Sequence, residues 1–249
     1  MHMADSLISP AVRGACWAAT AAGLAWSAKR VKEADDDRQV PMMGVMGAFV
    51  FAAQMINFAI PGTGSSGHLG GALLLTMLLG RHAAFLVIAS VLAVQALFFA
   101  DGGLLAFGCN VVNLGFFPAF VAWPLVFRPL AGRATGGPRL WIASLVAAVV
   151  GLQLGSLAVV LETKLSGISE LPFTTFLWLM QPIHLAIGVV EGLATAAVLS
   201  FVARARPEAL LAGAEPAGAA HRWRPVVAGL AAAAMLLGGV GAWFASADP

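Results

Sequence analysis

The first two residues of the chain, Met1 and His2, carry the donor atoms of a metal chelate. Excision of an initiator methionine requires a small second residue, so the histidine predicts a chain that keeps Met1 with a free α-amine. That amine, the deprotonated backbone nitrogen of His2 and its Nδ1 can close adjacent five- and six-membered rings around one ion. A fourth nitrogen in the same plane would complete a square-planar site, the geometry that favours Ni(II) or Cu(II).

The candidate for this fourth nitrogen is His68. It ends the glycine-rich loop Pro61–His68, whose backbone can bend into a re-entrant position because glycine adopts conformations that other residues avoid. The alternative is a chance Met-His start combined with an ordinary surface histidine. The residues alone leave both interpretations open.

The composition places this chemistry in a membrane. The chain has 249 residues, of which 60% are hydrophobic and 10% charged, whereas soluble domains have about 45–50% and about 25%. Its apolar stretches are too long and continuous for β-barrel strands, which leaves transmembrane helices. We therefore expect an all-α polytopic membrane protein with a compact bundle of about seven transmembrane helices and an appended eighth. The stretches lie at about 10–28, 42–60, 69–80, 83–100, 103–127, 140–161, 172–203 and 225–245.

The distribution of Lys and Arg predicts the orientation, because cytoplasmic loops carry most of these residues. If the N-terminus is extracytoplasmic and every stretch crosses, all Lys and Arg residues except Arg13 and Lys164 fall inside. The third stretch provides about 18 Å of helix at 1.5 Å per residue, so it crosses only with help from Gly67 and its neighbours or in a thinner bilayer. This orientation puts the loop 61–68 on the same side as the N-terminus.

Other features exclude whole classes of function. The net charge of +2 is too small to indicate a nucleic-acid partner. The two cysteines, Cys16 and Cys109, lie in apolar runs and are interpreted as core thiols. The sequence contains no G-x-x-x-x-G-K-[ST] motif, so the chain does not bind ATP through a P-loop of its own.

Polar residues within the apolar stretches are costly and therefore suggest a purpose. Asn110 and Asn113 share a helical face at i, i+3, where their amides could bond a loop, a ligand imidazole or simply another helix. His184 and Glu191 share a face at i, i+7, either as a buried polar network or on the route of an ion. Asp101 is interpreted as a helix N-cap.

The sequence resembles the CbiM/NikM family, the substrate-binding (S) components of energy-coupling-factor (ECF) transporters for nickel and cobalt. The similarity covers roughly residues 1–203, and its motifs follow one another at family-like spacing. They are MHMADSLISP from Met1, GSSGHLGG from Gly64, QALFFADGG from Gln95, the pair Asn110 and Asn113 before Gly115, and His184 through Glu191 and Gly192.

The resemblance implies that Met1, His2 and His68 bind a metal ion captured from outside the cell. Residues Ala4-Asp5 and Ser9-Pro10 are similar to the nickel branch, so Ni(II) is the expected cargo and Co(II) the alternative. The chain would need no cofactor. A supporting or route-lining role falls to Asn110, Asn113, His184 and Glu191.

The resemblance also implies partners in the bacterial cytoplasmic (inner) membrane. These are a transmembrane coupling (T) subunit and two ATPase subunits, which makes this chain a non-catalytic subunit. Small residues every four positions, Ala15, Ala19 and Gly23, form a stripe that permits close helix contact with the coupling subunit or within the chain. The alternatives are a secondary divalent-metal transporter or channel without ATPases, and an intramembrane enzyme using His184 and Glu191 as acid and base. The enzyme is disfavoured because the chain lacks a second buried carboxylate or a nucleophile pair.

The chain departs from a minimal family member after the metal-binding membrane domain 1–203. A polar cytoplasmic linker, 204–224, leads to an additional transmembrane helix, 225–249. This helix resembles the start of the small accessory membrane subunit that some nickel systems fuse to the substrate component. Because the usual second helix is missing, we expect a truncated fusion.

Overall fold

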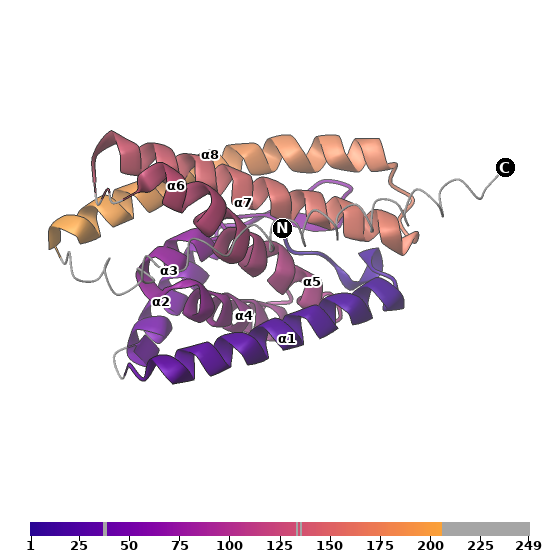
Figure 1. Cartoon of the computed structure of the whole chain (residues 1–249). Helices are drawn as coiled ribbons and strands as arrows, with labels where there is room; N and C mark the ends of the chain where they lie inside the picture. The colour runs from indigo at the N-terminus through magenta and orange to yellow at the C-terminus, as the bar shows by residue number, and fades with distance from the viewer. Residues whose placement is uncertain (37–38, 133, 135, 206–249) are drawn as a thin grey trace. The chain divides into compact units, whose positions relative to one another are not determined.

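The computed structural model of the chain describes residues 1–36, 39–132, 134 and 136–205 (Figure 1). These residues belong to a compact unit, Met1–Ala214. A second unit, Glu215–Pro249, and with it the additional helix expected at 225–249, lies outside the described residues, as does the predicted linker beyond residue 205.

The described residues are mostly helical, and their helices follow the predicted apolar stretches in order. Four segments are long and apolar enough to cross a membrane, namely α4, the segment Phe107–Ala131, α7 and α8, and α2 is a shorter apolar helix. This pattern supports a multi-pass membrane protein. The helices are α1 (Pro10–Ala34), α2 (Gln39–Gln54), α3 (Ala72–Leu79), α4 (Arg81–Phe98), α5 (Phe107–Val111), η2 (Val112–Phe127), α6 (Arg128–Ala131), α7 (Gly137–Ser166) and α8 (Phe173–Ala205), with a short 3₁₀ turn η1 (Asp5–Leu7).

The third predicted stretch forms only the eight-residue helix α3, which is about 12 Å long at 1.5 Å per residue. It begins after Gly71 and ends at Gly80, and both glycines have positive φ angles of 75° and 81°. Seven of its eight residues are buried. Its ends therefore meet protein, which explains how a break in a helix is tolerated inside an apolar bundle.

The all-helix prediction missed a β-hairpin before α3. Helix α2 ends at Gln54. Residues 55–60, which we expected to continue this helix, are therefore not helical. Instead β1 (Phe58–Ile60) pairs antiparallel with β2 (Ser65–Gly67). The turn between them contains Gly62 and Gly64, whose φ angles of 72° and 62° are readily adopted only by glycine.

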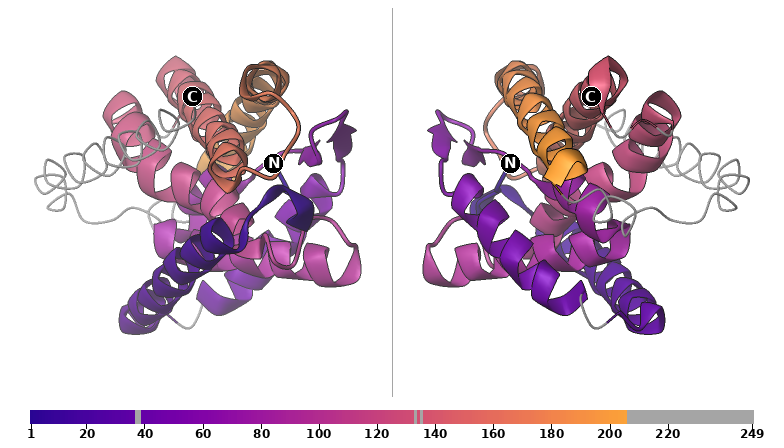
Figure 2. Two further views of the ribbon diagram at one scale, coloured as in Figure 1. Left: turned by 90° about the vertical axis from the view of Figure 1, so that its right-hand side faces the viewer. Right: turned by 90° about the vertical axis from the view of Figure 1, so that its left-hand side faces the viewer.

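The helices form two groups with the N-terminus between them. Helix α7 packs along α8 and η2, and α1 packs along α4 and α5. Figures 1 and 2 show the first residues lying between α1 and the pair α7 and α8. Segment η2 is π-helical and contains Pro118 and Pro124, which cannot donate the backbone hydrogen bonds of a regular α-helix. The N-terminus is thus surrounded by helices from both the beginning and the end of the described sequence.

Candidate metal centre

Residues 1–4 form an extended arm along the hairpin. The Met1 amine donates to the carbonyl oxygen of Ser66 at 2.5 Å. The Ser66 N–H in turn donates to the His2 carbonyl at 3.2 Å, and the Ser65 hydroxyl donates to the same oxygen at 2.8 Å. The Ala4 N–H donates to the Gly64 carbonyl at 3.1 Å. The arm is therefore fixed by backbone pairing rather than by a helix.

The structure brings together the three predicted ligand residues. The Met1 nitrogen lies 3.3 Å from Nε2 of His68, and the rings of His2 and His68 stack with centroids 4.4 Å apart. Met1, His2 and His68 are 0%, 3% and 2% exposed. His68 thus meets Met1, which is 67 residues away in sequence, and the adjacent His2 in one buried place.

The backbone N–H of His2 is accessible to the chemistry that the chelate requires. Among the described residues its N–H donates no hydrogen bond, whereas the N–H of Met3 donates to Asn110 Oδ1 at 2.9 Å and that of Ala4 donates to the hairpin. A peptide nitrogen that binds a metal must first lose its proton. At His2 this loss breaks no hydrogen bond within the described protein.

The side chain of His2 is held by Asp101. Its Nδ1 lies 2.8 Å from Asp101 Oδ1, and its Nε2 is buried without a hydrogen-bond partner among the residues that the structure describes. A ring nitrogen that donates to a carboxylate carries a proton and cannot bind a metal. Chelation through Nδ1 therefore requires the ring to turn over about Cβ–Cγ, which moves Nε2 toward the carboxylate. The prediction of Asp101 as an N-cap is wrong, because α5 begins at Phe107 with Ala106 as its N-cap residue.

Electrostatics favour unprotonated donors in this centre. Burial lowers the pKa of the Met1 amine to about 5, against the opposing charge of Asp101. Burial also lowers the pKa of His2, and it lowers that of His68 well below its usual value, helped by the nearby amine. Burial would raise the pKa of Asp101, but the hydrogen bond and charge of His2 hold it below its usual value. At neutral pH the amine and both imidazoles therefore carry no positive charge that would repel a cation.

His68 is oriented by its own loop and by α8. Its Nδ1 contacts the Leu69 carbonyl at 2.8 Å, which makes Nδ1 the protonated nitrogen and directs the Nε2 lone pair toward the amine. The next two N–H groups, of Gly70 and Gly71, donate to the Glu191 carboxylate at 2.5 and 3.1 Å. Glu191 thus fixes the backbone that carries His68.

The polar contact between His184 and Glu191, one of the two alternatives for this pair, is not formed in the described part of the chain. His184 Nδ1 contacts the Met180 carbonyl at 2.8 Å, and its Nε2 is buried without a hydrogen-bond partner. The physical reason is that Glu191 is already engaged by the two glycine N–H groups. The two side chains act separately.

Asn110 and Asn113 share one helical face, and both contact the arm. Asn110 bonds the backbone of Met3 on both sides, through Oδ1 to its N–H at 2.9 Å and through Nδ2 to its carbonyl at 3.5 Å. Asn113 Nδ2 lies 3.7 Å from the Met3 sulfur and donates to Glu162 Oε2 at 2.8 Å. Both amides bind the arm rather than an imidazole.

Comparison with known proteins identifies the family. The sequence pattern described as CbiM, the cobalt uptake substrate-specific transmembrane region, matches residues 2–209. The chain belongs to the CbiM family. It is 33% identical to a putative fused nickel transport protein, NikMN, of Archaeoglobus fulgidus, over 87% of this chain and 70% of that protein. It is 32% identical to the cobalt transport protein CbiM of Sorangium cellulosum, over 84% of this chain and 94% of that protein.

A solved structure shares the fold. The crystal structure of a truncated transition metal transporter is similar with a TM-score of 0.76 and 29% identity, over 82% of this chain and 99% of that one. This CbiM-family chain is therefore a cobalt or nickel uptake component of a metal transport system, and nothing in these similarities indicates catalytic activity.

The stripe of small residues on α1 of this CbiM-family chain is partly exposed and partly packed against another helix. Ala15 and Ala19 are exposed on α1, so they do not pack within the described bundle. Gly23 faces α4, where an added Cβ would lie 3.0 Å from Phe85 Cε1. The exposed alanines remain available to a partner.

Sequence reasoning missed several residues that hold this CbiM-type centre. Ser65 and Ser66 contribute through one hydroxyl and through backbone groups, which leave no signal in residue type. Gly155 on α7 makes room for Met1, since an added Cβ there would lie 2.9 Å from the Met1 sulfur. A glycine inside a long apolar helix is the one hint that could have marked this close approach.

Proposed function

We propose that this chain is the substrate-capture subunit of an ATP-driven ECF-type importer and binds Ni(II) through Met1, His2 and His68. The observation that carries the proposal is the buried Met1 amine 3.3 Å from Nε2 of His68, beside a His2 peptide N–H that donates to no described residue. The ion would take the amine nitrogen, the deprotonated peptide nitrogen, Nδ1 of His2 and Nε2 of His68.

The donor set favours nickel over cobalt. Four nitrogens in one plane suit a square-planar ion, which points to Ni(II) or Cu(II), and a relative with 33% identity bears a nickel transport name. Co(II) remains the alternative cargo, since other relatives bear cobalt names. The Asp101 carboxylate would accept a hydrogen bond from Nε2 of the turned His2 ring and so hold the ring in its metal-bound orientation.

Transport would proceed from an extracytoplasmic N-terminus across the bacterial inner membrane. With no P-loop in the sequence, the energy would come from two ATPase subunits through a transmembrane coupling subunit. The exposed face of α1 at Ala15 and Ala19 is the proposed contact with that subunit, because small side chains permit close helix packing. An accessory membrane subunit would bind or be fused beyond the described residues.

Blocking the amine tests the ligand set. We compare Ni(II) binding by isothermal titration calorimetry for the chain with a free Met1 amine and for the same chain with one alanine added before Met1. The extended chain should lose measurable binding, and proteolytic removal of the extension should restore it. Equal affinity of the extended chain would overturn the chelate. Metal uptake into vesicles without any ATPase would instead favour a secondary transporter.

A further inference from the structure

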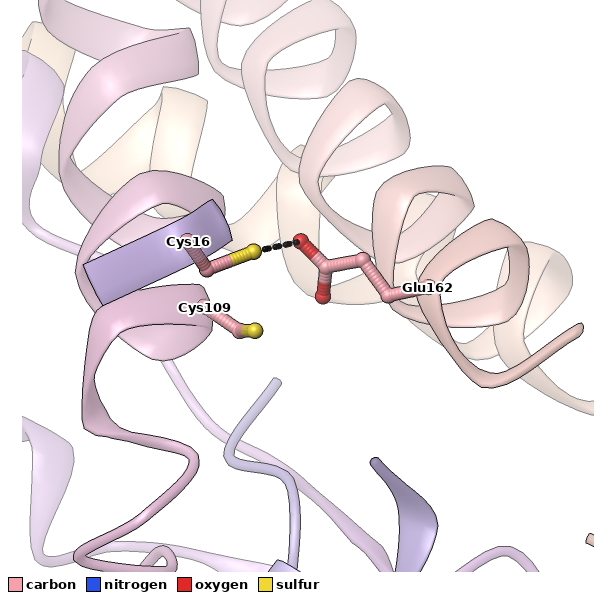
Figure 3. A group of neighbouring side chains, drawn as sticks. All are labelled: Cys16, Cys109 and Glu162. Carbon is pink, nitrogen blue, oxygen red and sulfur yellow. Dashed lines mark hydrogen bonds between the residues drawn. The ribbon is translucent and has the colours of Figure 1, made fainter. Parts of the chain in front are cut away.

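Cys16, Cys109 and Glu162 form a second donor cluster that the nitrogen centre does not use (Figure 3). They come from α1, α5 and α7, and Figure 3 shows the three side chains converging. The two sulfurs and a carboxylate oxygen all lie within 4.8 Å of one another. The sequence interpretation of two unrelated core thiols is therefore incomplete, because folding pairs them with each other and with a carboxylate.

The close contact between α1 and α5 fixes the two cysteines side by side. At Gly108 an added Cβ would lie 2.6 Å from the Trp17 backbone nitrogen, so only glycine allows this approach. The Thr20 hydroxyl donates to the Gly108 carbonyl at 2.8 Å. Cys16 and Cys109 neighbour these contact residues in sequence, and their thiols share the position that the contact defines.

The spacing of the donors matches that of a tetrahedral metal site. Metal–sulfur bonds of about 2.3 Å and metal–oxygen bonds of about 2.0–2.2 Å place two sulfurs about 3.8 Å apart, and a sulfur and an oxygen about 3.5 Å apart. The Cys16 sulfur lies 3.6 Å from Glu162 Oε1. No separation within the cluster exceeds 4.8 Å, so small rotations of the side chains would bring the donors to the ideal distances.

The carboxylate is already oriented for such a site. Asn113 donates to Oε2 of Glu162 at 2.8 Å, which leaves Oε1 directed at Cys16. In the described part of the chain no Lys or Arg forms an ion pair or hydrogen bond with Glu162. A cation would supply the charge partner that the protein does not.

We propose that Cys16, Cys109 and Glu162 bind a second, thiophilic divalent transition ion of the Zn(II) class, separate from the nitrogen centre. Three protein donors leave the fourth tetrahedral position open. Each thiol that binds the ion releases its proton to solvent. The proposal does not depend on nickel capture at Met1, since the two centres share no donor atom.

Co(II) serves as the probe, because thiolate ligation gives a charge-transfer absorption in the near ultraviolet that nitrogen and oxygen ligands do not give. The reduced full-length chain is titrated with Co(II) in detergent without oxygen. We expect this absorption in the wild type and in His68→Ala, which leaves all three donors in place. We expect its loss in Cys16→Ser and in Cys109→Ser, where serine keeps the size of the side chain and a hydrogen bond. Absence of the absorption in the wild type, or its persistence in both serine variants, would overturn the site.

Two measurements separate this result from loss of the fold. Cys109→Ser should bind Ni(II) at the N-terminal centre within about twofold of the wild type, which shows that the bundle is intact. Glu162→Gln keeps both thiols, so the absorption should appear at saturation but with affinity reduced on the order of tenfold. Unchanged Co(II) affinity in Glu162→Gln would remove the carboxylate from the ligand set.

Discussion

Asn113 contacts the N-terminal arm at Met3 and the second cluster at Glu162, and the two donor clusters that it connects are built in opposite ways. The nitrogen centre at Met1, His2 and His68 is carried by an extended arm and a loop, both held through backbone hydrogen bonds. The sulfur and oxygen cluster at Cys16 is carried by three helices in direct contact. Non-helical backbone can exchange its hydrogen bonds and change shape, whereas packed helices cannot. We infer that the first arrangement suits capture and release of an ion, and the second suits retention.

The largest expected difference between the two clusters is in how their metal affinity depends on pH. Below neutral pH the nitrogen centre releases one proton on binding, from the His2 peptide, so its affinity should fall about tenfold per pH unit. Because the pKa of the Met1 amine is lowered to about 5, protonation of this amine steepens the fall only below that pH. The other cluster should weaken about 100-fold per unit, because both thiols must release a proton to bind the ion. Calorimetry with Ni(II) and absorption titrations with Co(II) at several pH values give the change in affinity per pH unit at each cluster. Equal changes would show that the two clusters do not differ in their proton release.

Removal of the loop imidazole should affect only the nitrogen centre. His68→Ala deletes a proposed ligand, so Ni(II) affinity should fall by more than the roughly 10–100-fold loss that is typical when a residue supporting a ligand is removed. The matched control is His82→Ala on α4. His82 is half-buried, and not solvated as its place beside Arg81 would suggest, because its Nδ1 contacts the Ser27 hydroxyl at 3.2 Å. Comparable loss in both variants, measured by calorimetry, would show a general effect on the fold.

A smaller effect should follow at the residue that orients His2. Asp101→Asn keeps the size of the side chain but removes the charge that holds the imidazole, so Ni(II) binding should weaken about 10–100-fold. The control is Asn57→Ala, which removes the other partner of Asp101, at 2.6 Å, and leaves the carboxylate in place. Calorimetry should show a change of only a few-fold for the control. Wild-type affinity in Asp101→Asn would exclude a role for this contact.

The smallest effect concerns packing between α7 and the arm. Gly155→Ala places a Cβ against the backbone carbonyl oxygen of Asn113 and 2.9 Å from the Met1 sulfur, and overpacking of this kind costs about 1–3 kcal/mol. Thermal unfolding in detergent should register the loss, together with a few-fold weaker Ni(II) binding. Gly14→Ala on α1 is the control, because an added Cβ there meets nothing within 4 Å. An equal response of both variants would argue against close packing of Asn113 and Met1 around Gly155.

Hydropathy predicted the long helices well and the short elements poorly. The stretch 172–203 corresponds to α8 at Phe173–Ala205, and 140–161 corresponds to the longer α7 at Gly137–Ser166. The hairpin β1–β2 was not predicted, and α3 is shorter than the stretch 69–80 that predicted it, because apolar residues look the same whether they face lipid or other protein segments. Four predicted supporting residues lie on the described spans, and three of them hold the arm or the loop.

The candidate centre was predictable where its donor atoms belong to residues that a short stretch of sequence makes recognisable. Met1 and His2 are adjacent, and His68 has a distinctive glycine-rich setting. Asp101 was misinterpreted because its turn resembles a helix start, and its contact with His2 depends on where the arm lies. The cluster at Cys16, Cys109 and Glu162 follows only from the packing of three helices, which no local pattern reveals.

The enclosed arm has a consequence for biosynthesis. Met1 is synthesised well before its partners: its acceptor is on Ser66, the partner of Met3 is Asn110, and the loop beside it is secured by Glu191. The beginning of the chain must therefore wait, unpaired, until nearly two hundred residues have been made and inserted. An affinity tag placed at this end would obstruct the last step of assembly as well as the ligand, so purification handles belong elsewhere on the protein.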